Sequence, residues 1–129
     1  MSVVAVAKSL LEAILGSGPP KAYAVRPCQG RAWLRRFPGA GKGEVRAFLA
    51  MFAQAFAYRD QEKLKFHPDD SIYGVYRAHY PSLGWGDAME LETLEILLKR
   101  QYAFPVASVW SESLTLGQLF DALRKRDDA

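Results

Sequence analysis

The sequence predicts a mostly α fold, built as a small helical bundle, and three observations lead to this prediction. First, three stretches place apolar residues at helical spacing, namely 44–59, 87–102 and 115–123. Second, no region is rich in strand patterns, and no internal repeat is present. Third, half of the 129 residues are apolar, which is enough for the core of one domain.

The stretch 85–102 is the one around which the rest of the chain is predicted to be arranged. Asp87 is a suitable N-cap for a helix, and Glu90 stands at the capping-box position three residues later. The predicted core face of this helix carries Leu91, Leu94, Leu98 and Tyr102. Met89 and Ile96 lie on a different face, so we expect this helix to have apolar surface left over after it packs on its own core.

The elements before this helix follow in chain order. Residues 2–15 form a predicted amphipathic helix, which the Gly- and Pro-containing run 16–20 ends. The stretch 21–42 has little periodicity and is predicted to be a basic loop region, which leaves room for a short extended piece at 22–26 or 31–35. The stretch 44–59 is a predicted helix with a phenylalanine-rich core face. The polar stretch 61–66 is predicted to be extended.

The remaining elements are shorter. They are a turn at 67–71, a short aromatic helix or turn at 72–80, a loop at 81–86, and a short helical turn or extended piece at 106–110. Thr115 and Gln118 form a predicted capping box for the last helix, and the charged tail 124–129 is expected to fray. We expect a single domain over residues 1–129, in which 1–43 is an N-terminal addition and 44–126 is the bundle.

The charges are unevenly distributed along the chain. The stretch 21–46 contains seven basic residues and only Glu44 as an acid, whereas 87–95 contains four acids and no base. No apolar run is long enough for a membrane span, and residues 1–16 lack the basic start of a signal peptide. Together with the single Cys28, which cannot form an internal disulfide, this predicts a cytoplasmic protein with no membrane partner.

Several short motifs within 44–126 resemble those of the acyl carrier protein fold. The segment Asp87-Ala88-Met89 stands where carriers have Asp-Ser-Leu at the start of their second helix. Leu94 and Leu98 match helix core positions of that family, and Tyr102 matches its terminal aromatic residue. The segments 68–72 and 114–119 are similar to the loop before the motif and to the start of the last helix. Residues 86–91 also resemble the corresponding stretch of a bacterial family of carrier-like proteins of uncharacterised function. The resemblance implies a carrier-like bundle.

The same resemblance implies that the carrier chemistry is absent. Carriers bear phosphopantetheine on the serine hydroxyl of this motif, and Ala88 has no hydroxyl to modify. No cofactor is therefore expected. In carriers the acidic second helix is the surface that partners bind, and Glu90, Glu92 and Glu95 keep that character here.

Other candidate sites are weaker. His67, Asp69, Asp70 and His79 lack the spacing of metal ligands, so we expect no metal. The glycine-rich run 39–43 lacks the residues of a nucleotide-binding loop, and no nucleophile with its base is apparent, so we expect no catalytic residues and no enzyme. The basic segment 21–46, with Tyr23, Trp33 and Phe37, leaves open a nucleic-acid-binding module, although we expect nucleic acid not to be the partner.

The sequence therefore favours a non-catalytic protein-binding module. The predicted partner-binding residues are Trp85, Met89, Glu92, Glu95, Ile96, Tyr73 and Tyr76. One form of such a module is a bacterial immunity protein that binds and neutralises a cognate toxin domain. The alternatives are an accessory or degenerate carrier-like subunit of a biosynthetic complex, or the nucleic-acid-binding module of residues 21–46. The helix at 2–15 could instead cover Met89 and Ile96.

Overall fold

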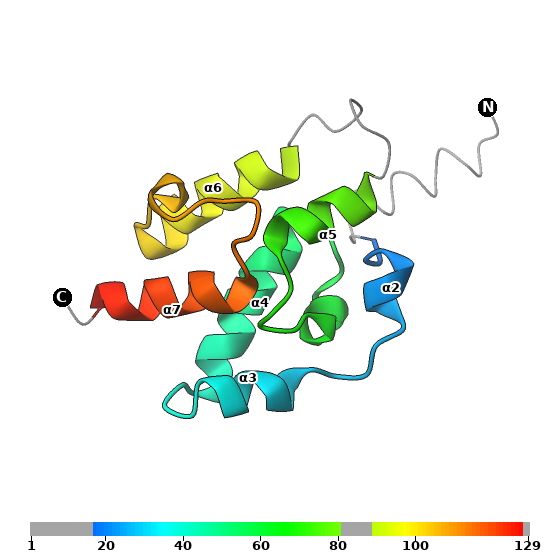
Figure 1. Cartoon of the computed structure of the whole chain (residues 1–129), viewed down its shortest axis with the longest axis horizontal. Helices are drawn as coiled ribbons and strands as arrows, with labels where there is room; N and C mark the ends of the chain where they lie inside the picture. The colour runs from blue at the N-terminus through cyan, green and yellow to red at the C-terminus, as the bar shows by residue number, and fades with distance from the viewer. Residues whose placement is uncertain (1–16, 81–88, 128–129) are drawn as a thin grey trace.

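The computed structural model describes residues 17–80 and 89–127, and this part of the chain is mostly helical (Figure 1). Its elements are α2 (Lys21–Ala24), α3 (Gly30–Arg36), α4 (Lys42–Ala55), η1 (Asp60–Lys65), α5 (Ile72–His79), α6 (Met89–Tyr102), η2 (Val106–Ser108) and α7 (Leu116–Asp127). Within the described ranges the only strand-like pairings are two isolated bridges, between Ser17 and Tyr58 and between Ser71 and Thr115. The prediction of a mostly α fold is confirmed. The predicted helix 2–15 and the loop 81–86 lie outside the described residues.

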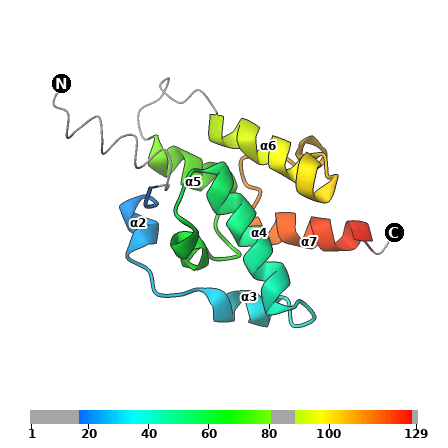
Figure 2. The same ribbon diagram turned by 180° about the vertical axis from the view of Figure 1, so that it is seen from behind.

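Helix α4, rather than α6, lies at the centre of the molecule (Figure 2). Its buried residues are Val45, Phe48, Leu49, Met51, Phe52, Ala53 and Ala55. It contacts η1 and α6, and the ring of Phe48 packs against rings from α3 and α7. The expectation that the rest of the chain is arranged around 85–102 is therefore wrong, because the apolar face of α4 is wide enough to be covered from several sides.

The stretch 21–42 was predicted to be a loop, but it contains the helices α2 and α3. Trp33 of α3 is completely buried, and its indole Nε1–H donates to the carbonyl oxygen of Phe66 at 2.8 Å. Its ring lies 6.0 Å from that of Phe37, 5.9 Å from Phe48 and 5.6 Å from Phe120. This burial stabilises a helix of only seven residues, which is too short to show a convincing helical period in the sequence.

The stretch 61–66 forms most of the 3-10 helix η1, and not the extended segment that was predicted. The Lys65 ammonium of η1 donates to the carbonyl oxygens of Ala24 at 3.1 Å and Arg26 at 2.7 Å. The Arg26 guanidinium donates in turn to both carboxylate oxygens of Asp70, at 2.7 and 3.0 Å. These bonds attach the residues after α2 to the middle of the chain, and such long-range partners leave no trace in local sequence.

Of the two predicted helix caps, the one before the last helix is present, and Asp87, the predicted N-cap of 87–102, lies outside the described residues. Thr115 and Gln118 make the reciprocal capping box, since each backbone N–H donates at 3.0 Å to the side-chain oxygen of the other residue. Ser71 caps α5 by accepting from the Gly74 N–H at 3.0 Å, which makes 72–79 a helix. The tail does not fray at 124, because α7 continues to Asp127 and Arg124 pairs with Glu44 at 3.3 Å.

The core face of α6 agrees with the predicted stripe in its centre. Leu94 and Leu98 are buried, whereas Leu91 and Tyr102 are partly buried and pack against the core. Leu97 is also buried, although it was not part of the predicted stripe. Trp33, Phe37 and Ala40 belong to the same core cluster as buried residues of 44–126, so this part of the segment 1–43 packs with the bundle.

Candidate functional site

The outer face of α6 exposes two large apolar side chains. Met89 is 60% exposed and Ile96 is 51% exposed, while Leu94, Leu97 and Leu98 bury the opposite face. Met89 and Ile96 are seven residues apart, which places them on one side of a helix with 3.6 residues per turn. Within the described residues, the only other exposed large hydrophobic side chains are Val25 and Trp110. The predicted second stripe is thus accessible over the part of the chain that the structure describes, and the helix 2–15 that was considered as its cover lies outside that part.

Two acids of α6 stand beside this stripe and line a groove. Glu92 is exposed, and Glu95 is half-buried and pairs with Lys99 at 3.4 Å. The groove has a volume of about 190 Å³ and is lined by Leu91, Glu92, Leu94, Glu95, Val106 and Trp110. It therefore joins an apolar wall to an acidic rim on one flank of the helix.

Trp110 was not among the predicted site residues. It follows η2 and precedes the polar run 111–113, so no helical or strand period marks it. In the sequence, only its residue type could have identified Trp110 as a site residue, because a tryptophan outside a periodic apolar stretch is a candidate recognition residue. Its exposure beside α6 extends the apolar surface beyond that helix.

The tyrosines predicted for the same surface have different positions. Tyr73 is half-buried, and its ring lies 5.9 Å from the guanidinium carbon of Arg77. Tyr76 is only 8% exposed and belongs to the core, so its assignment as a partner-binding residue is wrong. It lies on the inner face of α5, which the tertiary packing covers. Trp85 lies outside the described residues.

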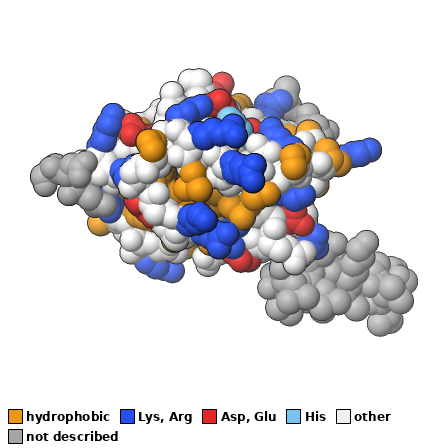
Figure 3. Space-filling model, turned by 90° about the horizontal axis from the view of Figure 1, so that it is seen from below, with side chains coloured by type: hydrophobic (Ala, Val, Ile, Leu, Met, Phe, Trp, Pro, Cys, Tyr) orange, Lys and Arg blue, Asp and Glu red, His pale blue; other side chains and the backbone are white. Residues whose placement is uncertain are grey.

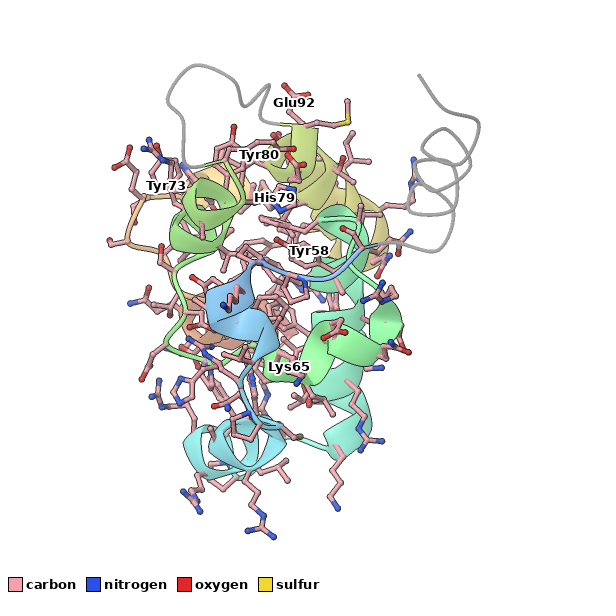
Figure 4. All side chains as sticks on the ribbon, turned by 90° about the vertical axis from the view of Figure 1, so that its right-hand side faces the viewer. Tyr58, Lys65, Tyr73, His79, Tyr80 and Glu92 are labelled. Carbon is pink, nitrogen blue, oxygen red and sulfur yellow. The ribbon has the colours of Figure 1, made fainter. Side chains whose placement is uncertain are left out.

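A cluster of polar aromatic side chains lies where the end of α5 meets the start of α6 (Figure 4). The Tyr80 hydroxyl donates to the Glu90 carboxylate, and the ring of His79 lies 4.7 Å from that of Tyr80 and 5.9 Å from that of Tyr58. The Tyr58 hydroxyl and the second oxygen of Glu90 are buried and have no hydrogen-bond partner among residues 17–80 and 89–127. This cluster fixes the first turn of α6 on α5.

Burial and charge perturb one group in this cluster. Burial raises the pKa of the Tyr58 phenol well above its usual value, and the Glu90 carboxylate raises it further. Tyr58 is therefore a neutral hydroxyl over the whole physiological range of pH. Because the group is 4% exposed, it is placed inside the protein rather than at a surface where a ligand could reach it.

The residues considered for a metal site have structural partners. Asp70 binds Arg26 and also accepts from the backbone N–H of His67 at 2.7 Å. Asp69 pairs with Arg36 at 2.8 Å, and its own N–H donates to the ring Nδ1 of His67 at 3.0 Å. His79 belongs to the other end of α5. Within residues 17–80 and 89–127, no group of three or more His, Cys, Asp or Glu side chains is arranged to hold a metal ion.

The aromatic residues considered for nucleic-acid stacking are not displayed. Trp33 is completely buried and Phe37 is 9% exposed, so neither ring can stack on a base. Tyr23 is half-buried beneath the Arg26 guanidinium, whose carbon lies 4.8 Å from the ring centre. The idea that these three rings form a binding platform within 21–46 is wrong.

Comparison of the chain with protein-family models, with curated proteins and with solved structures finds no match. The resemblance to acyl carrier proteins therefore stays a prediction, and position 88, on which its chemistry depends, lies outside the described residues. None of the described helices is both long and apolar enough to cross a membrane.

Proposed function

We propose that this protein is a non-catalytic protein-binding module that presents the outer face of α6 to a partner protein. One observation carries the proposal: α6 already buries Leu94, Leu97 and Leu98, yet it leaves Met89 and Ile96 more than half exposed. Exposed apolar side chains that share one side of a helix mark an interaction surface more often than isolated ones do.

The chemistry of the surface describes the partner. The apolar residues would supply the contact area, and the acids beside them would steer an approaching positive surface and set specificity. The adjoining groove, lined by Leu91 and Trp110, would accept one protruding apolar side chain of that partner. The partner should therefore present an apolar projection surrounded by Lys or Arg.

A cognate toxin domain is the specific partner that we propose within this class. A domain that acts on nucleic acid needs a basic surface, and an acidic helix that covers such a surface would neutralise it without any catalytic step. The role of immunity protein is compatible with these features. No observation favours the alternative of an accessory carrier-like subunit.

The test is a photo-crosslink from α6 in the native host. A benzophenone amino acid would replace Ile96, and the matched control would replace Gln54, an exposed residue of α4. We expect one dominant adduct from position 96 and none from position 54, and mass spectrometry would identify the partner.

Binding of the identified partner would then be measured with purified variants. Met89→Asp and Glu92→Lys should each weaken binding at least about tenfold, which corresponds to about 1.4 kcal/mol, while their circular dichroism spectra stay unchanged. Equal crosslinking from both positions, or unchanged affinity in both variants, would remove α6 from the proposal.

A further inference from the structure

A second groove lies on another side of the molecule, between α3, the start of α4 and η1. It is lined by Cys28, Gly30, Arg31, Leu34, Lys42, Val45, Arg46 and Leu64, and its volume is about 190 Å³. Its apolar walls come from Leu34, Val45 and Leu64, one from each of the three elements. In Figures 1 and 2, α3 and α6 lie at opposite ends of the molecule, so this groove is separate from the surface proposed above.

Three exposed cations surround these apolar walls, and none has a partner in the described part of the chain. Arg31, Lys42 and Arg46 make no ion pair or hydrogen bond among residues 17–80 and 89–127. Figure 3 shows this side of the molecule, with hydrophobic side chains at its centre and Lys and Arg side chains on both sides.

Three other cations of the same region do have partners within the protein. Arg26 is paired with Asp70, Arg36 is paired with Asp69, and the Lys65 ammonium is bound by two carbonyl oxygens. Glu44, the acid of the segment 21–46, pairs with Arg124 of α7. The positive charge around the groove is therefore uncompensated within the described structure, and an anionic ligand would gain from it.

We infer that this groove binds an acidic amphipathic helix of a partner protein. Aliphatic walls between two helices suit Leu or Ile side chains that a helix presents at positions i, i+3 and i+4. Carboxylates on the flanks of the same helix would then face Arg31 on one side and Lys42 and Arg46 on the other. The chain would thus have two docking surfaces of opposite charge, one acidic on α6 and one basic at α3 and α4.

The observations favour a helix over the other anionic ligands. Single-stranded nucleic acid binds through aromatic rings that stack on its bases as well as through its phosphates, and the rings of Trp33 and Phe37 are in the core. Three cations alone would give a duplex only weak, salt-sensitive phosphate contacts. A lipid surface binds protruding apolar side chains, whereas Leu34 and Leu64 are half-buried and Val45 is buried within the recess.

The test uses the full-length protein and a synthetic helical peptide as the probe. The peptide would have about 18 residues, above the length at which isolated helices are only marginal in water, with a Leu stripe at i, i+3, i+4 and i+7 and Glu on both flanks. Fluorescence anisotropy should show saturable binding that weakens at high salt. A peptide with Lys in place of each Glu, and one with the same composition but a scattered Leu stripe, should each bind at least about tenfold more weakly.

Protein variants locate the binding. Arg31→Glu/Arg46→Glu should weaken the peptide at least about tenfold, while Lys21→Glu/Arg100→Glu, which makes the same charge change at two exposed residues outside the groove, should leave affinity within about twofold. A loss of affinity equal in both variants would attribute the binding to net charge and overturn the inference.

Cys28 gives a second measurement that needs no variant, because it is the single thiol of the chain, is exposed and lines the groove. The acidic peptide should slow its alkylation by iodoacetamide, followed by intact mass, and the Lys peptide should not. Tighter binding of a single-stranded or double-stranded oligonucleotide, or of vesicles containing phosphatidylserine, would overturn the inference. So would self-association that Arg31→Glu/Arg46→Glu abolishes in sedimentation. Failure here leaves the α6 proposal untouched, since that surface is tested with different residues.

Discussion

Helices α4 and α6 have the same length, 14 residues, yet they relate to the protein in opposite ways. Helix α4 buries seven residues and contacts neighbours on several sides, whereas α6 buries three and keeps its other face exposed. Both helices show clear apolar spacing in the sequence. The difference shows that periodicity identifies a helix, while the width of its apolar face decides whether the helix becomes the centre of the core or a surface.

The largest effect is expected in α4. Phe52→Ala should lower the free energy of unfolding by about 3–5 kcal/mol, because a completely buried ring is replaced by a cavity. Phe52 packs against Phe56 at 4.6 Å and Phe66 at 5.0 Å between ring centres. Chemical denaturation would measure the change. A cost below about 1 kcal/mol would mean that α4 is not the centre of the core.

The buried face of α6 should also be sensitive. Leu98→Ala should cost about 2–5 kcal/mol, since Leu98 is fully buried and its truncation leaves a cavity against the core. The same denaturation series would test it. An unchanged midpoint would show that the inner face of α6 is not packed as described, and the comparison with α4 would have to be drawn differently.

The contact between α4 and α6 can be tested at Tyr58, which follows α4 and lies near Glu90 of α6. Tyr58→Phe should raise the free energy of unfolding by about 1 kcal/mol, because it removes a buried hydroxyl that has no hydrogen-bond partner in the described part of the chain. Tyr80→Phe is the matched control, and it should destabilise the protein by about 0.5–1.5 kcal/mol because its hydroxyl binds Glu90.

The stability of the wild type and that of Tyr58→Phe should depend differently on pH. The pKa of Tyr58 is raised in the folded state, so ionisation of this residue does not reduce stability below about pH 10, the pKa of an unfolded tyrosine. As pH rises above that value, the unfolded state ionises while the folded state stays neutral, and stability falls. Tyr58→Phe should lose less stability than the wild type between neutral pH and alkaline pH. Identical slopes would show that Tyr58 ionises equally in both states.

The backbone after α4 and the backbone after α6 adopt a similar conformation. A smaller change in stability is expected from substitutions there. Both helices are followed by an alanine in the left-handed region, Ala57 at φ 57° and Ala103 at φ 51°. Glycine carries no steric penalty there, so Ala57→Gly and Ala103→Gly should each stabilise by about 0.5–1 kcal/mol. The control is Ala47→Gly in the exposed interior of α4, which should destabilise by about the same amount. Thermal melting of all three would check the signs.

The smallest effect on stability is expected at the outer face of α6. Met89→Asp should change the free energy of unfolding by no more than about 0.5 kcal/mol, because the side chain is 60% exposed. This result would sharpen the contrast between the two faces of the helix. Unfolding of the variant would instead make the second stripe part of the core and would withdraw the proposed function.

Much of the helical framework could be predicted from the sequence, because the signals are local. The spacing of Phe48 and Phe52 and the capping pair Thr115 and Gln118 lie within a few residues of what they determine. Helix α3 could not be predicted, because its stability comes from the burial of Trp33 against Phe66 and Phe120, which are 33 and 87 residues away in the chain.

The candidate sites divide in the same way. The exposed apolar positions Met89 and Ile96 followed from counting residues around one helix. Counting residues could not predict three other features, because each depends on which elements become neighbours. They are the burial of Tyr76, the position of Trp110 beside α6 and the basic groove.

By itself, the sequence determined the helical class of this protein, its main helices and the acidic, partly apolar outer face of α6. These features depend on interactions between residues three or four positions apart, and such interactions do not depend on which other segments pack against the helix. Only the tertiary structure decided that α4 is the central helix, that 21–42 contains two helices of which α3 is tied to the core by Trp33, and that Arg31, Lys42 and Arg46 surround one groove. The physical reason is that burial and charge pairing act between segments distant in sequence, and their partners are chosen only when the helices pack together.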